Sequence, residues 1–192
     1  MSKLYCYSSI DCVTLKENDM VSKRVEEALN KQISLEGNSS QFYLSMASWA
    51  ESQGYNGTAE FLYRQTDEER QHMLKLIRYV NERGGAAIIP PIDGPPVDFD
   101  GLEKVFEMLL QHELKVTAAV NDVVHICLEE KDYTTHNFMQ WYVSEQIEEE
   151  ATARGILDRI KLTGAEKGGL YLFDRDLENL AGGSVSVPEA GK

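Results

Sequence analysis

The sequence lacks the apolar stretches that membrane insertion and secretion require. No apolar run approaches the roughly 20 residues of a membrane-spanning helix. The first residues, MSKLYCYSSIDCVTL, contain no apolar core of the kind found in secretory signals. Asp11 adds an acid where an organelle transit peptide has few. We therefore expect no membrane partner and predict a cytoplasmic protein, with an organelle as the alternative location.

Cysteine and basic residues are scarce as well. The three cysteines, Cys6, Cys12 and Cys127, have a spacing that fits no metal motif, and their odd number suits free thiols in a reducing compartment. Lys and Arg total 19 against 32 Asp and Glu, which gives a net charge of -13. This charge argues against nucleic acid as a partner, because phosphates attract basic side chains. It suits a protein that attracts cations.

Proline is rare, and its position marks the one clear interruption in a sequence that otherwise favours helix. Of five prolines, four lie in the stretch IIPPIDGPPVDFDG. We predict that Gly54 and Gly57 break the first helix, and that Asp100 caps the third with Glu103 completing a capping box. The expected helices are 21–52, 58–83, 100–130, 133–163 and a short fifth helix at 174–180.

Chain geometry predicts how these helices connect. A helix of about 28 residues is roughly 42 Å long, and the segment 84–99 can extend about 50 Å at roughly 3.3 Å per residue. That segment can cross the whole length of a bundle, whereas the short connections elsewhere join antiparallel neighbours. The predicted fold is all-α: a four-helix bundle over 21–180 with a long crossover between the second and third helices. Residues 1–20 are expected to form an N-terminal arm, and 181–192 a flexible tail.

Acidic side chains fall on the inward faces of the first three helices. At about 100° per residue, Glu36 lies in the middle of the apolar stripe of the first helix, and Glu113 in that of the third. Glu69 and His72 share the stripe of the second helix as Glu-x-x-His, and Glu68 lies at its edge. Buried carboxylates persist when they are paired or coordinate a metal.

The fourth helix repeats the pattern in the segment WYVSEQIEEE at 141–150. Glu145, Glu148 and Glu149 share one arc with the aromatic residues of that segment. Glu150 points elsewhere and is predicted to be solvated, and His112 is predicted to lie on the surface. A coincidence of inward acids in all four helices is improbable, so we interpret the interior as a polar site.

Several inward acids and one imidazole, with no inward Lys or Arg among them, lack a counter-charge. A bound cation would supply it. The absence of thiolate excludes a cysteine-type structural zinc site, and calcium rarely takes imidazole. An oxygen-rich set with one His suits iron or manganese, with zinc as a competitor, and this many acids can hold two ions.

These residues together resemble a known family. Glu36 with Tyr43, the segment EERQH at 68–72, Glu113 and the segment WYVSEQIEEE are similar to those of the bacterial-type non-haem ferritins. The resemblance covers about residues 21–180, including the proline-rich crossover and GLYLFDRDLENL near the end. It implies a ferritin-like bundle with a di-iron ferroxidase centre, since inward carboxylates from all four helices are a general feature of such bundles.

The resemblance also implies roles for individual residues. Glu36, Glu69 and His72 would hold the first iron. Glu69 would bridge to a second iron, and the other residues around that iron would be Glu113, Glu149, Gln146 and the redox-active phenol of Tyr43. A third iron site of the bacterial type would use Glu68, Glu145 and Glu148, with Glu149 contributing.

Two departures from related families refine this prediction. Gln146-x-x-Glu149 stands where bacterioferritins and rubrerythrins have a second Glu-x-x-His. Arg70 stands where bacterioferritins carry a haem-ligating Met, so no haem is expected. The chain also has none of the cysteine pairs that rubrerythrins carry.

The function that the resemblance implies is iron storage and detoxification. Fe(II) and dioxygen would react at the ferroxidase centre, and Fe(III) mineral would accumulate in the cavity of a 24-subunit homo-oligomer. His136 either lines a threefold pore of this shell or is an exposed polar residue. Two alternatives stay open: a smaller di-iron or manganese oxidase or peroxidase on the same bundle, and a shell subunit that nucleates mineral without oxidising iron.

Overall fold

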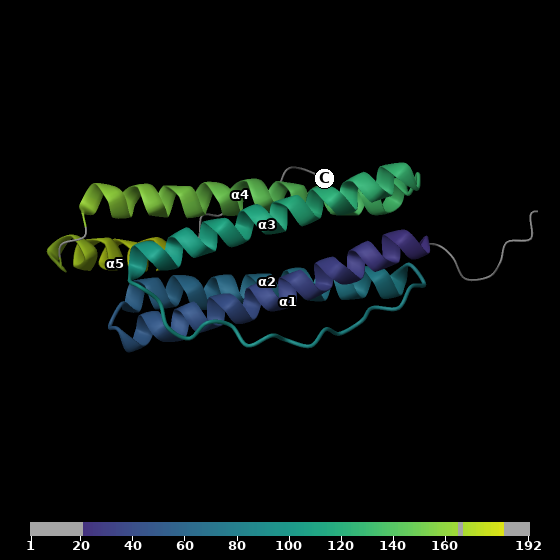
Figure 1. Ribbon diagram of the computed structural model, residues 1–192. Helices are drawn as coiled ribbons and strands as arrows, with labels where there is room; N and C mark the ends of the chain where they lie inside the picture. Colours follow the sequence, from purple (N-terminus) through teal and green to yellow (C-terminus); the bar gives the residue numbers. More distant parts are fainter. Residues whose placement is uncertain (1–20, 165–166, 183–192) are drawn as a thin grey trace, which may run out of the picture.

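The computed structural model describes residues 21–164 and 167–182, and these residues form five helices and no strand (Figure 1). The helices are α1 (Lys23–Ser52), α2 (Asn56–Glu82), α3 (Leu102–Glu129), α4 (Tyr133–Thr163) and α5 (Lys167–Gly182). The predicted all-α bundle with a fifth helix near its C-terminal end is confirmed. None of the helices in these ranges combines the length and the apolar content needed to cross a lipid bilayer.

The four long helices form two antiparallel pairs joined by the long crossover. α1 packs along α2, α3 packs along α4, and α1 also contacts α3. The crossover runs the length of the bundle beside α1 (Figure 1). Asn30 in α1 donates to the carbonyl oxygen of Ala86 at 3.1 Å, and Asn38 accepts from the backbone nitrogen of Asp93 at 3.3 Å. The predicted crossover between the second and third helices is therefore confirmed.

The apolar core consists of two clusters with a polar layer between them. One cluster lies toward α5 and includes Met46, Leu62 and Phe106. The other lies toward the opposite end and includes Leu29 and Met139. On each long helix, the buried acidic residues lie between the positions that supply the two clusters. The polar site is thus held at mid-bundle by apolar packing on both sides.

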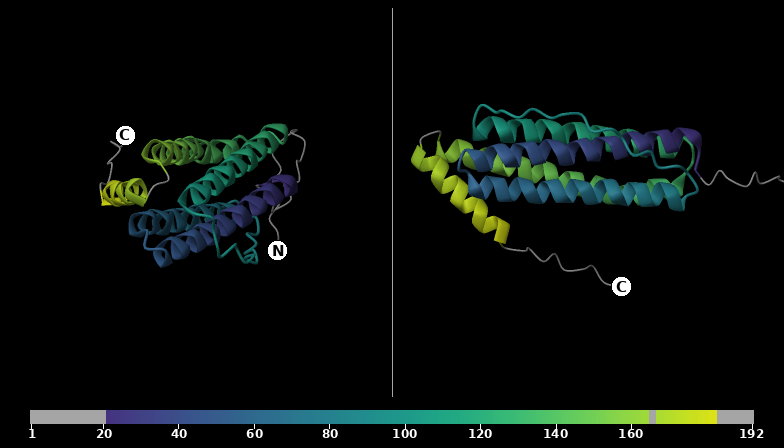
Figure 2. Two further views of the ribbon diagram at one scale, coloured as in Figure 1. Left: turned by 60° about the vertical axis from the view of Figure 1, so that its left-hand side comes forward. Right: turned by 90° about the horizontal axis from the view of Figure 1, so that it is seen from below.

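α5 lies across one end of the bundle at an angle to the long helices, in contact with α2 and α4 (Figure 2). The carboxylate of Asp174 in α5 accepts from the backbone nitrogens of Gly57 and Thr58 at 3.1 and 2.8 Å, and so caps the start of α2. A Cβ on Gly57 would lie 1.9 Å from the carbonyl oxygen of Asp174. The prediction that Gly57 breaks a helix is wrong: it lies inside α2, where its small size admits α5.

Two further helix boundaries differ from the prediction. α3 is capped by Gly101, at φ 92° and without a side-chain hydrogen bond, so the predicted capping box of Asp100 and Glu103 is wrong. α5 begins at Lys167 rather than at 174, and it extends to Gly182. A Cβ on Gly169 would lie 2.2 Å from the Thr163 carbonyl oxygen, so this glycine allows α5 to start close to the end of α4. The predicted arm, 1–20, lies outside the described residues, as does the tail beyond residue 182.

Candidate metal centre

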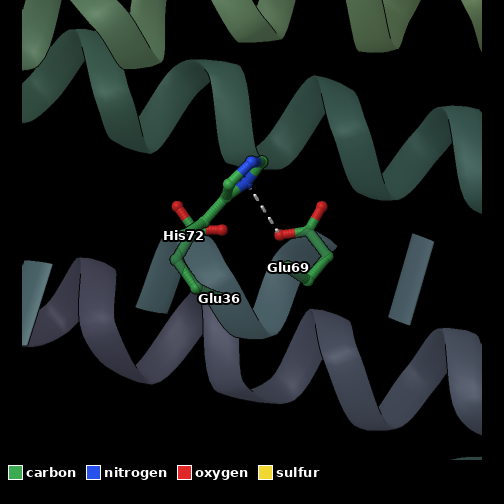
Figure 3. A group of neighbouring side chains, drawn as sticks. All are labelled: Glu36, Glu69 and His72. Atoms are coloured by element: carbon green, nitrogen blue, oxygen red, sulfur yellow. Dashed lines mark ion pairs between the residues drawn. The ribbon is translucent and has the colours of Figure 1, made fainter. Parts of the chain in front are cut away.

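Three metal-ligand side chains meet in the polar layer. Glu36 comes from α1, and Glu69 and His72 come from successive turns of α2 (Figure 3). One ligand atom from each lies within 4.8 Å of the others. The side chains are buried, with exposed fractions of 1%, 2% and 3%. The structure thus brings together the three residues that were predicted to hold the first iron.

Local helix geometry and one hydrogen bond within α1 position this group. Glu69 and His72 are three residues apart and therefore share a face of α2, with Nδ1 of His72 3.5 Å from Oε2 of Glu69. Gln32 lies one turn before Glu36 and donates its Nε2 to Oε1 of Glu36 at 2.8 Å. These contacts hold the carboxylates of Glu36 and Glu69 facing one another between α1 and α2.

Two carboxylate oxygens of the three-residue group have no hydrogen-bond partner. Oε2 of Glu36 and Oε2 of Glu69 are buried and accept no hydrogen bond of ordinary geometry from the described residues; the nearest nitrogen recorded for Oε2 of Glu69 is Nδ1 of His72, at 3.5 Å. A buried carboxylate oxygen without a donor costs free energy. None of the Lys and Arg side chains in the described part of the chain is buried. The donor set therefore fits a cation that would satisfy both oxygens.

A second group of buried residues, from α3 and α4 with Tyr43 of α1, faces the first. Glu113 and Glu149 have exposed fractions of 0% and 7%, and Gln146 and Tyr43 are buried as well. The hydroxyl of Tyr43 donates to Oε1 of Glu113, and Nε2 of Gln146 donates to Oε2 of Glu113 at 3.3 Å. Among the described residues, Glu113 and Glu149 are not part of a tight set of three ligand atoms. The structure brings these residues to the same layer without closing a second ligand set around them.

The charges in this layer repel one another. Burial, and then the charge of Glu69, raises the pKa of Glu36 well above its ordinary value. The pKa of Glu69 is likewise raised by burial. Burial and the charge of Glu113 raise the pKa of Glu149 to about 8. Burial and mutual repulsion thus favour the protonated form of these carboxyls, and a bound cation would oppose that shift.

A third group lies at the edge of the layer. Glu68, His72 and Glu145 have ligand atoms within 4.8 Å of one another, with Glu68 exposed and Glu145 partly buried. Glu148 is exposed and does not belong to this group. The structure thus brings two of the predicted third-site acids beside His72. The i,i+4 spacing of Glu68 and His72 is the sequence signal for this arrangement.

Aromatic rings cover the His72 side of the centre. The indole ring of Trp141 meets the imidazole edge to face, with ring centroids 5.1 Å apart. The hydroxyl of Tyr142 donates to the carbonyl oxygen of His72 at 2.8 Å. The ammonium of Lys75 lies 3.2 Å from the centre of the Trp141 ring. Trp141 thus packs against the His72 ring, and Tyr142 holds the backbone of α2 at this residue.

Two predictions about residues near the centre are wrong. His112 is partly buried rather than on the surface: its Nε2 lies 2.7 Å from Oγ of Ser39, and burial lowers its pKa to about 4. Glu150 is partly buried rather than fully solvated: its side chain is 15% exposed, accepts from Thr117 and pairs with Arg154. In both cases a partner on a neighbouring helix or turn draws the side chain inward. Sequence reasoning missed Gln32 and Thr117 altogether.

Comparison with known proteins gives one family. The family profile described as Ferritin-like domain matches residues 26–163. The chain is 44% identical over 162 residues to a probable bacterial non-heme ferritin-like protein of Haemophilus influenzae, covering 84% of this chain and 98% of that protein. It is also 44% identical over 162 residues to the bacterial non-heme ferritin of Campylobacter jejuni, covering 84% and 97%. An open pore ferritin from the archaeon Archaeoglobus fulgidus superposes with a TM-score of 0.81 at 39% identity, covering 83% of this chain and 97% of that one.

Proposed function

This chain belongs to the ferritin family of iron-storage proteins, and we propose that it oxidises Fe(II) with dioxygen at a di-iron centre inside each bundle. Fe(II) and dioxygen are the substrates, and Fe(III) mineral is stored in the cavity of a 24-subunit homo-oligomer. No haem takes part. We place the protein in the cytoplasm as part of the same proposal.

One observation carries this proposal: the buried trio of Glu36, Glu69 and His72 has two carboxylate oxygens without a hydrogen-bond donor among the described residues. A storage subunit that only nucleated mineral would not need acids in its core, where they cost stability. Hard carboxylate oxygens with one imidazole suit iron. The acidic net charge of -13 favours the approach of Fe(II).

Each buried residue has a part in binding the substrate. The first Fe(II) binds between Glu36, Glu69 and His72, and its charge offsets the burial and repulsion that raise the pKa of the two carboxyls. The second Fe(II) binds between Glu69, Glu113 and Glu149, so that Glu69 bridges the pair. Gln146 lies beside the second ion, and Tyr43 holds Glu113 through its hydroxyl.

Oxidation then follows from the charge of the centre. Anionic oxygen ligands stabilise Fe(III) over Fe(II) and so lower the reduction potential of the pair. Each Fe(II) gives one electron, and the two electrons together with two protons from water reduce one dioxygen molecule to hydrogen peroxide. We assign the phenol of Tyr43, which is hydrogen-bonded to Glu113, to electron exchange with the pair. Trp141 and Tyr142 pack against the His72 ring and hold it in place beside the ions.

The acids at the edge of the centre provide a path by which Fe(III) leaves it. Glu68 and Glu148 are exposed and Glu145 is partly exposed, so this group is open to solvent on one side. We assign these acids, with Glu149, to a third iron site that modulates oxidation or passes Fe(III) onward. His136, on α4 and partly exposed, stays a prediction as a pore residue.

The test is replacement of the bridging ligand. Glu69→Ala should lower the initial rate of Fe(II) oxidation, followed by absorbance, by at least about tenfold, because it removes a ligand of both ions. Glu60→Ala is the matched control, since it removes an exposed acid from the same helix. Size-exclusion chromatography with light scattering should give an assembly of about 24 subunits for both variants. Oxidation by Glu69→Ala at the wild-type rate would rule out the proposed centre.

A further inference from the structure

A hydrogen-bonded set of side chains connects the buried Glu113 to the outside of the bundle between α3 and α4. Nε2 of Gln146 donates to Oε2 of Glu113 at 3.3 Å. The hydroxyl oxygen of Thr117 lies 2.9 Å from Oε1 of Gln146 and 2.7 Å from Oε1 of Glu150. Arg154 forms an ion pair with the other carboxylate oxygen of Glu150. The set borders a cavity of about 270 Å³ between the two helices.

The hydroxyl of Thr117 has too few protons for its neighbours. A threonine hydroxyl carries one proton, and here both nearby atoms, Oε1 of Gln146 and Oε1 of Glu150, are acceptors. Hydrogen bonds to a charged carboxylate are stronger than those to a neutral amide oxygen. The Thr117 proton therefore goes to Glu150. With the Gln146 amide nitrogen directed at Glu113, the contact between Thr117 and Oε1 of Gln146 then has no proton.

Turning the Gln146 amide by 180° removes this deficit. Its nitrogen then donates to Thr117, and Thr117 donates to Glu150, so each of these contacts has its own proton. The turn directs the amide oxygen at Glu113, which places two acceptors opposite each other. A cation next to Glu113 would be bound by both oxygens. The orientation with the amide nitrogen toward Glu113 thus suits the metal-free centre. The orientation with the amide oxygen toward Glu113 suits the metal-bound centre.

We propose that Thr117 and Glu150 form a hydrogen-bond switch that turns the Gln146 amide and presents its oxygen to the second metal ion. This inference rests on the proposed binding of that ion at Glu113 and Glu149. Thr117 touches no substrate, so it acts as a positioning residue. Thr117 can accept from Gln146 because its own hydroxyl proton is donated in a hydrogen bond to Glu150. Arg154 keeps the Glu150 carboxylate in place through an ion pair. The switch favours the carbonyl-facing orientation once the ion arrives.

The probe is Zn(II), which binds similar ligands and does not react with dioxygen. Calorimetric titration of the metal-free, assembled protein measures the affinity of the ion at each position, and anomalous scattering from crystals locates it. Thr117→Val deletes the hydroxyl at nearly constant volume and should weaken the second ion about 10- to 100-fold, as loss of an orienting partner does. Thr117→Ser keeps the hydroxyl and should bind as the wild type does. Thr152→Val, an exposed position of α4, is the matched control.

Glu150→Gln tests the proton count without deleting a contact. A glutamine can donate to Thr117, which frees the threonine proton for Oε1 of Gln146 and stabilises the metal-free orientation. The affinity for the second ion should therefore fall, while the affinity at Glu36 and His72 changes less. In zinc-bound wild-type crystals, Oε1 of Gln146 should lie about 2.0–2.2 Å from the second ion.

The outcomes separate this inference from the function on which it rests. Wild-type protein with no ion at Glu113 and Glu149 would overturn the di-iron centre and the switch together. Two bound ions in the wild type, with unchanged affinities in Thr117→Val and Glu150→Gln, would overturn the switch alone. A second ion bound with Gln146 still directing its nitrogen at Glu113 would also overturn it.

Discussion

Replacing Glu149 by glutamine should stabilise the metal-free protein at alkaline pH. Burial and the charge of Glu113 raise the pKa of the Glu149 carboxyl from 4.5 to about 8. The folded state therefore holds this proton more tightly than the unfolded state does. The resulting contribution to stability is fully present below about pH 4.5 and is lost as the pH rises to about 8. At about 1.36 kcal/mol for each pH unit, the loss is at most about 5 kcal/mol per subunit.

The assay is thermal unfolding in the presence of a chelator, at pH 5 and pH 8.5 and at one protein concentration. The wild-type melting temperature should fall between the two pH values by more than that of Glu149→Gln. Glu36 titrates in both proteins, and the charge of Glu149 also raises the pKa of Glu69, so the difference between the two proteins reports Glu149 together with its effect on Glu69. Glu148→Gln removes the same formal charge from an exposed position of α4 and should keep the wild-type pH dependence. An identical pH dependence in the wild type and Glu149→Gln would refute the reasoning.

The remaining predictions concern packing, one buried hydrogen bond and one thiol. Gly57→Ala should lower the free energy of unfolding by about 1–3 kcal/mol in calorimetry, because its Cβ would overlap the Asp174 backbone. Gly155→Ala, whose Cβ meets nothing within 4 Å, should instead raise it by up to about 1 kcal/mol. Tyr43→Phe removes a donor from a buried carboxyl and should cost the metal-free protein about 1.5–3 kcal/mol in the same melts; an unchanged melting temperature would contradict that contact. Burial raises the pKa of Cys127 to about 11, so peptide mapping should find it unmodified by iodoacetamide at pH 8 until the protein is unfolded.

Helical periodicity predicted much of the fold because the buried acids interrupt otherwise regular apolar stripes. Glu36 and Glu113 were placed inward from the positions of their apolar neighbours, and both are buried. The bounds of α4 agree with the prediction, since charged and glycine residues frame it. Gly57 could not be interpreted in the same way: its size is required by Asp174, a residue more than a hundred positions away in the sequence.

Periodicity was less informative about the surroundings of the candidate site. It gives the direction of a side chain relative to its own helix, but not the partner that a neighbouring helix offers. His112 was assigned to the surface because it lies about 100° from Glu113, yet Ser39 on α1 contacts it there. Glu150 points away from the other acids of α4, yet Thr117 on α3 reaches it. The ligand roles of the buried acids stay predictions until an ion is located.

Because the apolar core is divided into two clusters, the stability of the bundle does not depend on an ion in the polar layer between them. In a small zinc domain the metal supplies most of the folding free energy, and the chain unfolds when the metal leaves. Here the clusters around Phe106 and around Leu29 clamp both ends of the helices whether or not an ion lies between them. The helices are therefore held together at both ends independently of any ion in the middle of the bundle.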